Sequence, residues 1–252
     1  MIAIAVVAYA IADVVHEALG HGGACVLTGG QPRVLSTVHF ECSADNQIVL
    51  AGGTIANLIA GGVAWAIGRS ATRSTAGAYF WWLFMTVNLL QGAGYFLFSG
   101  VANIGDWAGF INGLEPVWAW RAALTVIGAV LYTACVWFAL RELIPFIDGR
   151  GDERVKYGRR LTVVPYVAGG IVSCLAGLFN PVGMLLVGIS AAAASFGGTS
   201  GLAWMWQFLR NPQLAGVSPH AAVITRSRPW IISAVIVAAI FVGLLGRGVR
   251  LG

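Results

Sequence analysis

The sequence predicts an all-α polytopic membrane protein with six or seven transmembrane helices and a short irregular or hairpin-like segment after the first. Of its 252 residues, 58% are hydrophobic and only 10% are charged, whereas about a quarter of the residues of a soluble domain are charged. The mean hydropathy is +0.80. Apolar runs close to the length of about 20 residues that crosses a bilayer recur along the whole chain.

Seven apolar segments account for this prediction. They cover residues 2–26, 48–68, 78–100, 117–140, 162–179, 181–198 and 229–246. The fifth and sixth meet at Asn180-Pro181, which predicts either a tight helical hairpin or one broken helix. Polar or charged loops separate the other segments, at 27–47, 69–77, 103–116, 141–160 and 210–228. In the first of these loops, the alternation of "RVLSTVHF" predicts the hairpin-like segment near 31–42.

Basic residues are distributed unevenly between the two sides of this seven-span arrangement. One set of loops holds 11 Lys and Arg residues, and the other side holds 4. Because cytoplasmic loops carry the excess of Lys and Arg, we expect the amino terminus and loop 141–160 in the cytoplasm and Asp106 on the opposite side of the cell membrane. A net charge of +5 therefore needs no nucleic-acid partner, and the expected surroundings are membrane lipid.

Two further features of the sequence argue against a cleavable signal peptide and against two common kinds of cysteine site. The first residues lack a basic region before the apolar run, so we expect no cleavable signal peptide. The four cysteines have no CxxC spacing, which disfavours a zinc ribbon or a thioredoxin-like site.

The end of the first segment reads "VVHEALGHGG" and concentrates ionisable residues where lipid would disfavour them. In the zinc motif HExxH, two histidines four residues apart share one helix face, but His16 and His21 are five apart, about 140° around a regular helix. A π-bulge would realign them, as would a break at Gly20. A third possibility keeps the helix regular, with Glu17, His21 and Cys25 on one face and His16 as an outer partner or base.

A third metal ligand is expected from Asp106, which follows the third segment on the same side as the end of the first. His39 is a weaker candidate from the loop between. Open zinc sites commonly use three protein ligands and leave a position for water, whose proton Glu17 could accept during attack on a carbonyl. The simpler interpretation is that these side chains only hydrogen-bond to one another and to neighbouring helices.

Three ordered features over residues 10–112 resemble the site-2 protease family of intramembrane zinc metalloproteases. The first is "HEALGHGG", similar to the family's HExGH box with one residue inserted. The second is "AGGTIANLIAGG", with Gly53 where the family has proline and Asn57 retained. The third runs from Asn88 to Asp106, with Gln91 in place of a proline and a longer spacing. The resemblance implies zinc bound by His16, His21 and Asp106, with Glu17 as the base.

We therefore divide the chain into residues 1–115, a candidate metal-site core of three spans, and residues 116–252, transmembrane helices to which no motif assigns a role. The first functional hypothesis is a zinc-dependent intramembrane protease that acts on a transmembrane protein or peptide. The second is a transporter or channel that uses His16, Glu17 and Asp106 as a proton or ion relay. The third is a non-catalytic helper that retains the fold. Four histidines are too few for a histidine-box di-iron hydroxylase.

Overall fold

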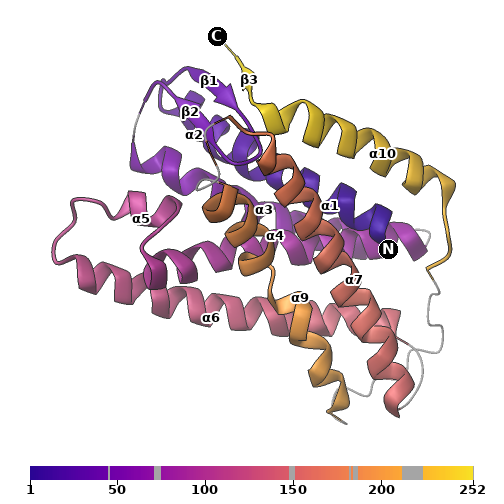
Figure 1. The fold of residues 1–252 in the computed structure, drawn as a ribbon. Coiled ribbons are helices and arrows are strands. Elements are labelled where there is room, and N and C mark those ends of the chain that lie inside the picture. The colour runs from indigo at the N-terminus through magenta and orange to yellow at the C-terminus, as the bar shows by residue number, and fades with distance from the viewer. Residues whose placement is uncertain are drawn as a thin grey trace.

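The computed structural model of the protein describes residues 1–252 except 45, 71–74, 148–150, 182, 184–186, 212–223 and 252, and it is almost entirely helical (Figure 1). The first long helix has three continuous parts: α1 (Ile2–Val14), a π-helical part η1 (Val15–Gly22) and α2 (Gly23–Leu27). The other main helices are α3 (Gln47–Ser70), α4 (Thr75–Ala102), α5 (Asp106–Phe110), α6 (Val117–Leu143), α7 (Gly151–Leu178), the π-helical η3 (Val187–Gly198), α9 (Gly201–Trp204) and α10 (Arg228–Gly243). Short 3-10 turns lie at Ile144–Phe146, Met205–Arg210 and Leu245–Arg247.

Among the described residues, five helical stretches are long and apolar enough to cross a membrane. They are Ile2–Leu27, Gln47–Ser70, Val117–Phe146, Gly151–Leu178 and Arg228–Arg247. The expected segments 78–100 and 181–198 correspond to α4 and η3, which are not among these five stretches. Residues 182 and 184–186 of the second segment lie outside the described part. The expected loop 210–228 also lies largely outside it.

A small antiparallel sheet follows the first helix. Strand β1 (Pro32–Leu35) pairs with β2 (Phe40–Cys42), which confirms the hairpin expected near 31–42. On its other edge β1 pairs with β3 (Val249–Arg250), a strand that the sequence analysis did not predict. A disulfide between Cys25 and Cys42 fixes β2 to α2.

Helix α4 packs against α1, α3, α5, α6 and η3 and supplies much of the buried core. Fully buried side chains from α1, α4, α6, α7 and α9 form one cluster, including Tyr9, Leu83, Leu140, Leu161 and Leu202. This cluster joins the first 115 residues to the rest of the chain in a single core.

The segment 141–160 is mostly helical, so its interpretation as a charged loop was wrong. Helix α6 continues to Leu143, and α7 begins at Gly151. Asp152 and Glu153 lie in the first turn of α7, where their negative charge is favourable beside the positive end of the helix dipole. The start of α7 is also packed, because the side chain of Leu209 covers Gly158.

The pair α7 and η3 forms the helical hairpin that Asn180-Pro181 predicts as one of two alternatives. The hydroxyl of Tyr166 donates to the carbonyl of Phe196, at 3.3 Å. The Phe196 ring also lies against Gly170, where a Cβ would overlap it. Helix α10 packs across α1 and α7 (Figure 1).

Candidate metal centre

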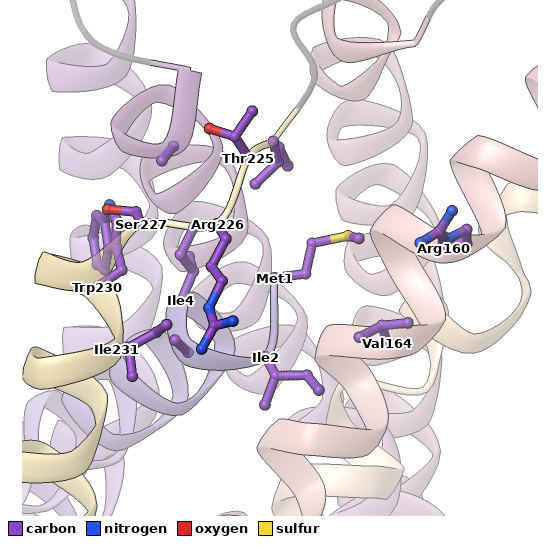
Figure 2. Close-up of a pocket in the computed structure, with 13 residues that line it drawn as sticks. Met1, Ile2, Ile4, Arg160, Val164, Thr225, Arg226, Ser227, Trp230 and Ile231 are labelled. Atoms are coloured by element: carbon purple, nitrogen blue, oxygen red, sulfur yellow. The ribbon is translucent and has the colours of Figure 1, made fainter.

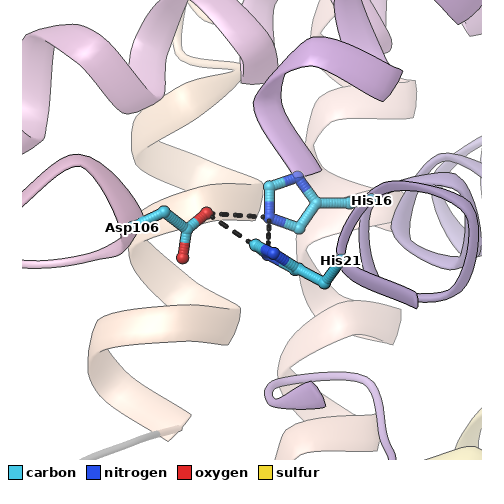
Figure 3. Close-up of side chains that lie close together, drawn as sticks. All are labelled: His16, His21 and Asp106. Atoms are coloured by element: carbon cyan, nitrogen blue, oxygen red, sulfur yellow. Dashed lines mark hydrogen bonds and ion pairs between the residues drawn. The ribbon is translucent and has the colours of Figure 1, made fainter. Parts of the chain in front are cut away.

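The π-helical register of η1 brings His16 and His21 onto one face. In a π-helix the hydrogen bonds run from residue i to i+5, so side chains five apart lie one above the other. The two Nε2 atoms are 3.2 Å apart, and the rings meet edge to face with centroids separated by 4.8 Å. Figure 3 shows both rings directed toward Asp106. Of the three possibilities that the sequence left open, the first is therefore the one found.

Glycines permit η1 to lie directly against α3. A Cβ on Gly20 would be 2.5 Å from the Cα of Gly53, and one on Gly52 would overlap the carbonyl of Gly20. A Cβ on Gly53 would come within 2.5 Å of Nε2 of His16 and 2.7 Å of Nε2 of His21. The backbone of α3 at Gly53 thus forms one wall of the site, in contact with the nitrogens themselves.

A relay of buried amides fixes which nitrogen of His16 carries a proton. The Asn88 amide donates to the carbonyl of Phe84 at 2.8 Å, so its oxygen faces Asn57. The amide of Asn57 donates to this oxygen at 2.8 Å, and the oxygen of Asn57 therefore faces Nδ1 of His16, at 2.5 Å. Because an amide oxygen can only accept, Nδ1 of His16 must be the donor.

The main chain fixes the proton of His21 on Nδ1, the same ring nitrogen as in His16. Its Nδ1 donates to the carbonyl of Val49 at 2.7 Å. When both imidazoles are neutral, their Nε2 atoms therefore carry lone pairs and no proton. Two lone pairs at 3.2 Å repel each other unless a cation, either a proton or a metal ion, lies between them.

Asp106 adds a negative charge to this pair of nitrogens. Its Oδ2 lies 3.1 Å from Nε2 of His16 and 3.5 Å from Nε2 of His21, and its side chain is 20% exposed. It is the first residue of α5, directly after Gly105, whose φ of 82° is in the left-handed region. The neighbouring Trp107 donates to the hydroxyl of Thr54 at 3.0 Å and so attaches α5 to α3.

The ionisation of Asp106 depends on the histidines. Burial alone would raise the pKa of its carboxyl, but hydrogen bonds with His16 and His21 and the charge of these rings hold that pKa well below its usual range. In the metal-free form, a proton on an Nε2 atom lets that ring donate to the carboxylate. A metal ion would take the place of that proton.

The three donor atoms have the separations that a tetrahedral ion requires. Donors about 2.0–2.1 Å from a zinc ion at tetrahedral angles lie about 3.3–3.4 Å from one another. The observed separations between the three atoms are 3.1, 3.2 and 3.5 Å. His16, His21 and Asp106 are also the group among the described residues that could hold a metal ion.

Glu17 is buried beside this group. The residue is only 5% exposed, and its Oε2 has no hydrogen-bond partner among the described residues. Its carboxyl interacts electrostatically with His21, His16 and Asp106. A buried carboxyl oxygen without a partner is costly, and here it is available to a water molecule or a substrate.

Other sequence-predicted residues lie elsewhere. His39 is exposed in the turn between β1 and β2, where its carbonyl accepts from Ser36. Cys25 is in the disulfide, so the alternative face of Glu17, His21 and Cys25 was wrong.

Tyr95 and Val49 were not identified from the sequence. The ring of Tyr95 stacks on His16, with centroids 4.6 Å apart and planes inclined by 22°. Tyr95 is seven residues after Asn88, two helical turns along the same face of α4, and this spacing was a usable signal. The contribution of Val49 is a main-chain carbonyl, for which side-chain patterns give no signal.

No protein-family model, curated protein or solved structure matches this chain. The resemblance to the site-2 proteases therefore rests on the motifs quoted above.

Proposed function

We propose that this chain is a polytopic integral membrane protein of the cell membrane that binds zinc through His16, His21 and Asp106 and acts as a site-2-protease-like metallopeptidase. The observation that carries the proposal is the pair of Nε2 lone pairs, held toward each other and toward a carboxylate by buried hydrogen bonds. Such an electron-rich group needs a cation, and two imidazoles with one carboxylate suit zinc.

Exposed apolar surface supports the membrane part of the proposal. Along α10, Ile232, Val235, Ile236 and Ile240 are each at least half exposed. A soluble monomer rarely exposes so large an apolar face, whereas hydrocarbon solvates it. The expected six or seven spans would include α4, whose buried polar residues Thr86, Asn88 and Gln91 are shielded from lipid by the surrounding helices.

The site has the groups that peptide hydrolysis requires. Bound zinc would act as a Lewis acid toward a carbonyl oxygen. Glu17, whose Oε2 has no hydrogen-bond partner among the described residues, would accept a proton from the attacking water and transfer it to the leaving nitrogen. The relay through Asn57 and Asn88 keeps Nδ1 of His16 protonated, so that Nε2 stays available. The side chain of Asp106 is 20% exposed, and we propose that water and an unwound transmembrane peptide would enter on this side.

Metal analysis of the purified full chain tests the binding step. We expect about one zinc per chain, and we expect His16→Ala and Asp106→Ala to lower zinc affinity by more than the roughly 10–100-fold that loss of an outer partner costs. His39→Ala is the matched control and should retain zinc. A wild-type protein that binds no zinc would overturn the metal site.

Cleavage of a fluorophore- and quencher-labelled single-span peptide in liposomes tests the chemistry. Glu17→Gln should keep its zinc and lose about 10²–10⁴-fold in rate. Bound zinc without any cleavage that depends on Glu17 would identify a non-catalytic metal protein. Proton flux across the same liposomes that depends on Glu17 and Asp106 would instead identify a relay.

A further inference from the structure

At the opposite end of α1 from the histidines, a cavity of about 440 Å³ lies between the starts of α1 and α10 and the first half of α7 (Figure 2). Its walls are largely apolar and include Ile2, Val164 and Ile231. Two arginines interrupt them: Arg160 on α7, and Arg226 in the segment before α10. Figure 2 shows the Arg226 guanidinium between Ile231 and Ile2, with Arg160 across the cavity on α7.

Neither arginine has an ion-pair partner among the described residues. The ion pairs found in the described part of the chain involve other residues, and both Arg160 and Arg226 are exposed. Two guanidinium groups from separate elements thus border one apolar cavity. An arginine pair of this kind suits a phosphate, because each planar group can donate two parallel hydrogen bonds to its oxygens.

An apolar groove continues from this cavity along α1 and α7. The groove has a volume of about 580 Å³, shares Ile2 and Val164 with the cavity, and is lined further along by Val167, Ile171 and Leu175. These last three side chains are 43%, 49% and 46% exposed. From Val164 to Leu175 the helix rises about 16 Å, close to half of the roughly 30 Å thickness of a bilayer's hydrocarbon core.

We propose that this cavity and groove bind an anionic glycerophospholipid, with its phosphate between Arg160 and Arg226 and one acyl chain along α1 and α7. The cavity supplies positive charge and the adjoining groove supplies an apolar channel one leaflet deep. A neighbouring apolar helix would use the groove but leave both arginines unpaired. The expected topology also places this end in the cytoplasmic leaflet, where anionic lipids are concentrated. The proposal rests on the membrane embedding proposed above but not on the metal.

Native mass spectrometry of the full chain in a neutral detergent tests the headgroup site. We expect dioleoyl phosphatidylglycerol to bind more tightly than dioleoyl phosphatidylcholine, which has the same acyl chains. At about 1 kcal/mol for each arginine near a membrane surface, the variant Arg160→Gln/Arg226→Gln should lose about 25-fold in affinity for the anionic lipid. The control Arg141→Gln/Arg210→Gln removes the same charge from exposed positions that do not line the cavity, and it should change this affinity less than threefold.

Two further arms identify the ligand. Inorganic phosphate should fail to displace the lipid, and Ile171→Trp, which fills the groove, should weaken it while leaving both arginines in place. Equal binding of the two lipids, equal losses in the two double variants, or displacement by phosphate alone would each overturn the proposal. The zinc content of Arg160→Gln/Arg226→Gln should equal that of the wild type, so a failed lipid site is distinguishable from a failed metal site.

Discussion

The side-chain oxygen of Asn57 and Nδ1 of His16 are hydrogen-bonded at 2.5 Å across the contact between α3 and η1. This bond determines the tautomer of the imidazole, and so it determines whether Nε2 can bind a metal. Outer partners of this kind are part of a metal site although they never touch the ion.

Removal of this partner should weaken metal binding without removing a ligand. We expect Asn57→Ala to lower zinc affinity by about 10–100-fold. Asn88→Ala should have a smaller effect, because Asn88 acts on His16 only through Asn57. Competition with a fluorescent zinc chelator measures both affinities. A larger loss for Asn88→Ala than for Asn57→Ala would contradict the relay.

The wall of the site at Gly53 offers a test with a closely matched control. In Gly53→Ala the new methyl group would occupy the space beside both Nε2 atoms, so we expect the loss of stoichiometric zinc. In Gly62→Ala, on the same helix, the methyl group meets nothing within 4 Å, and zinc should be retained. This second substitution should raise stability by up to about 1 kcal/mol through helix propensity. Metal content and thermal unfolding of the two variants decide the point; full zinc in Gly53→Ala would mean that the histidines are not held against α3.

Acid should release the metal, because protons and zinc compete for the same Nε2 lone pairs. The direction follows from the site: affinity falls as pH falls, and the protons are taken up by the imidazoles. Asp106 should not limit this release, since its lowered pKa keeps it ionised at a pH where an ordinary aspartate is protonated. Its own stabilising contribution is present above the ordinary aspartate pKa and is lost only as pH falls through the lowered value. A zinc titration between pH 5 and 8, repeated with Asp106→Asn, tests this prediction. An acid limb of the affinity curve that disappears in the variant would be evidence against it.

The disulfide between Cys25 and Cys42 provides a second argument about orientation. Disulfides persist in oxidising compartments. This one lies near the end of the first helix, beyond His16 and His21. The basic-residue count predicts that this end is outside the cell. In a background without free cysteines, a membrane-impermeant thiol reagent should label Asn112→Cys in intact cells and leave Asp152→Cys unlabelled. The reverse pattern would invert the topology.

Removal of this disulfide should also loosen the hairpin. The bond closes a loop with a sequence separation of 17. From the entropy of the unfolded chain, we expect the variant Cys25→Ser/Cys42→Ser to lose about 3 kcal/mol in free energy of unfolding. Protease resistance of the hairpin at 31–42 measures the effect. Unchanged resistance would show that pairing with β3 suffices.

The residues of the candidate site were accessible from the sequence because their chemistry is unusual in an apolar segment. His16, His21 and Asp106 were identified by type, by spacing and by the side of the membrane predicted for them, and the structure brings them together. The five-residue spacing made a distortion of the helix two of the three possibilities, but it did not distinguish the π-helix from a break at Gly20 or from a regular helix.

Long-range and main-chain contacts were not accessible in this way. The carbonyl of Val49 and the close approach at Gly53 depend on how η1 packs against α3, and no local pattern encodes that distance. The many charged residues of 141–160 led us to predict a loop there. In the structure acidic residues form the first turn of α7, and the start of this helix packs against Leu209. The strand β3 is two residues long, too short for alternation to be recognised.

The hydrogen bond between Tyr9 and Thr199, at 2.7 Å, joins two residues that are 190 apart in sequence, so it can form only late in biosynthesis. A chain leaves the ribosome from its amino terminus, so the helix that carries both histidines is made first. It must persist without this contact while α3, α5 and all other residues before Thr199 are added. The helix made first is therefore among the last to be secured, and a premature stop anywhere before Thr199 leaves the candidate metal centre on a helix that lacks both this hydrogen bond and its packing against α10.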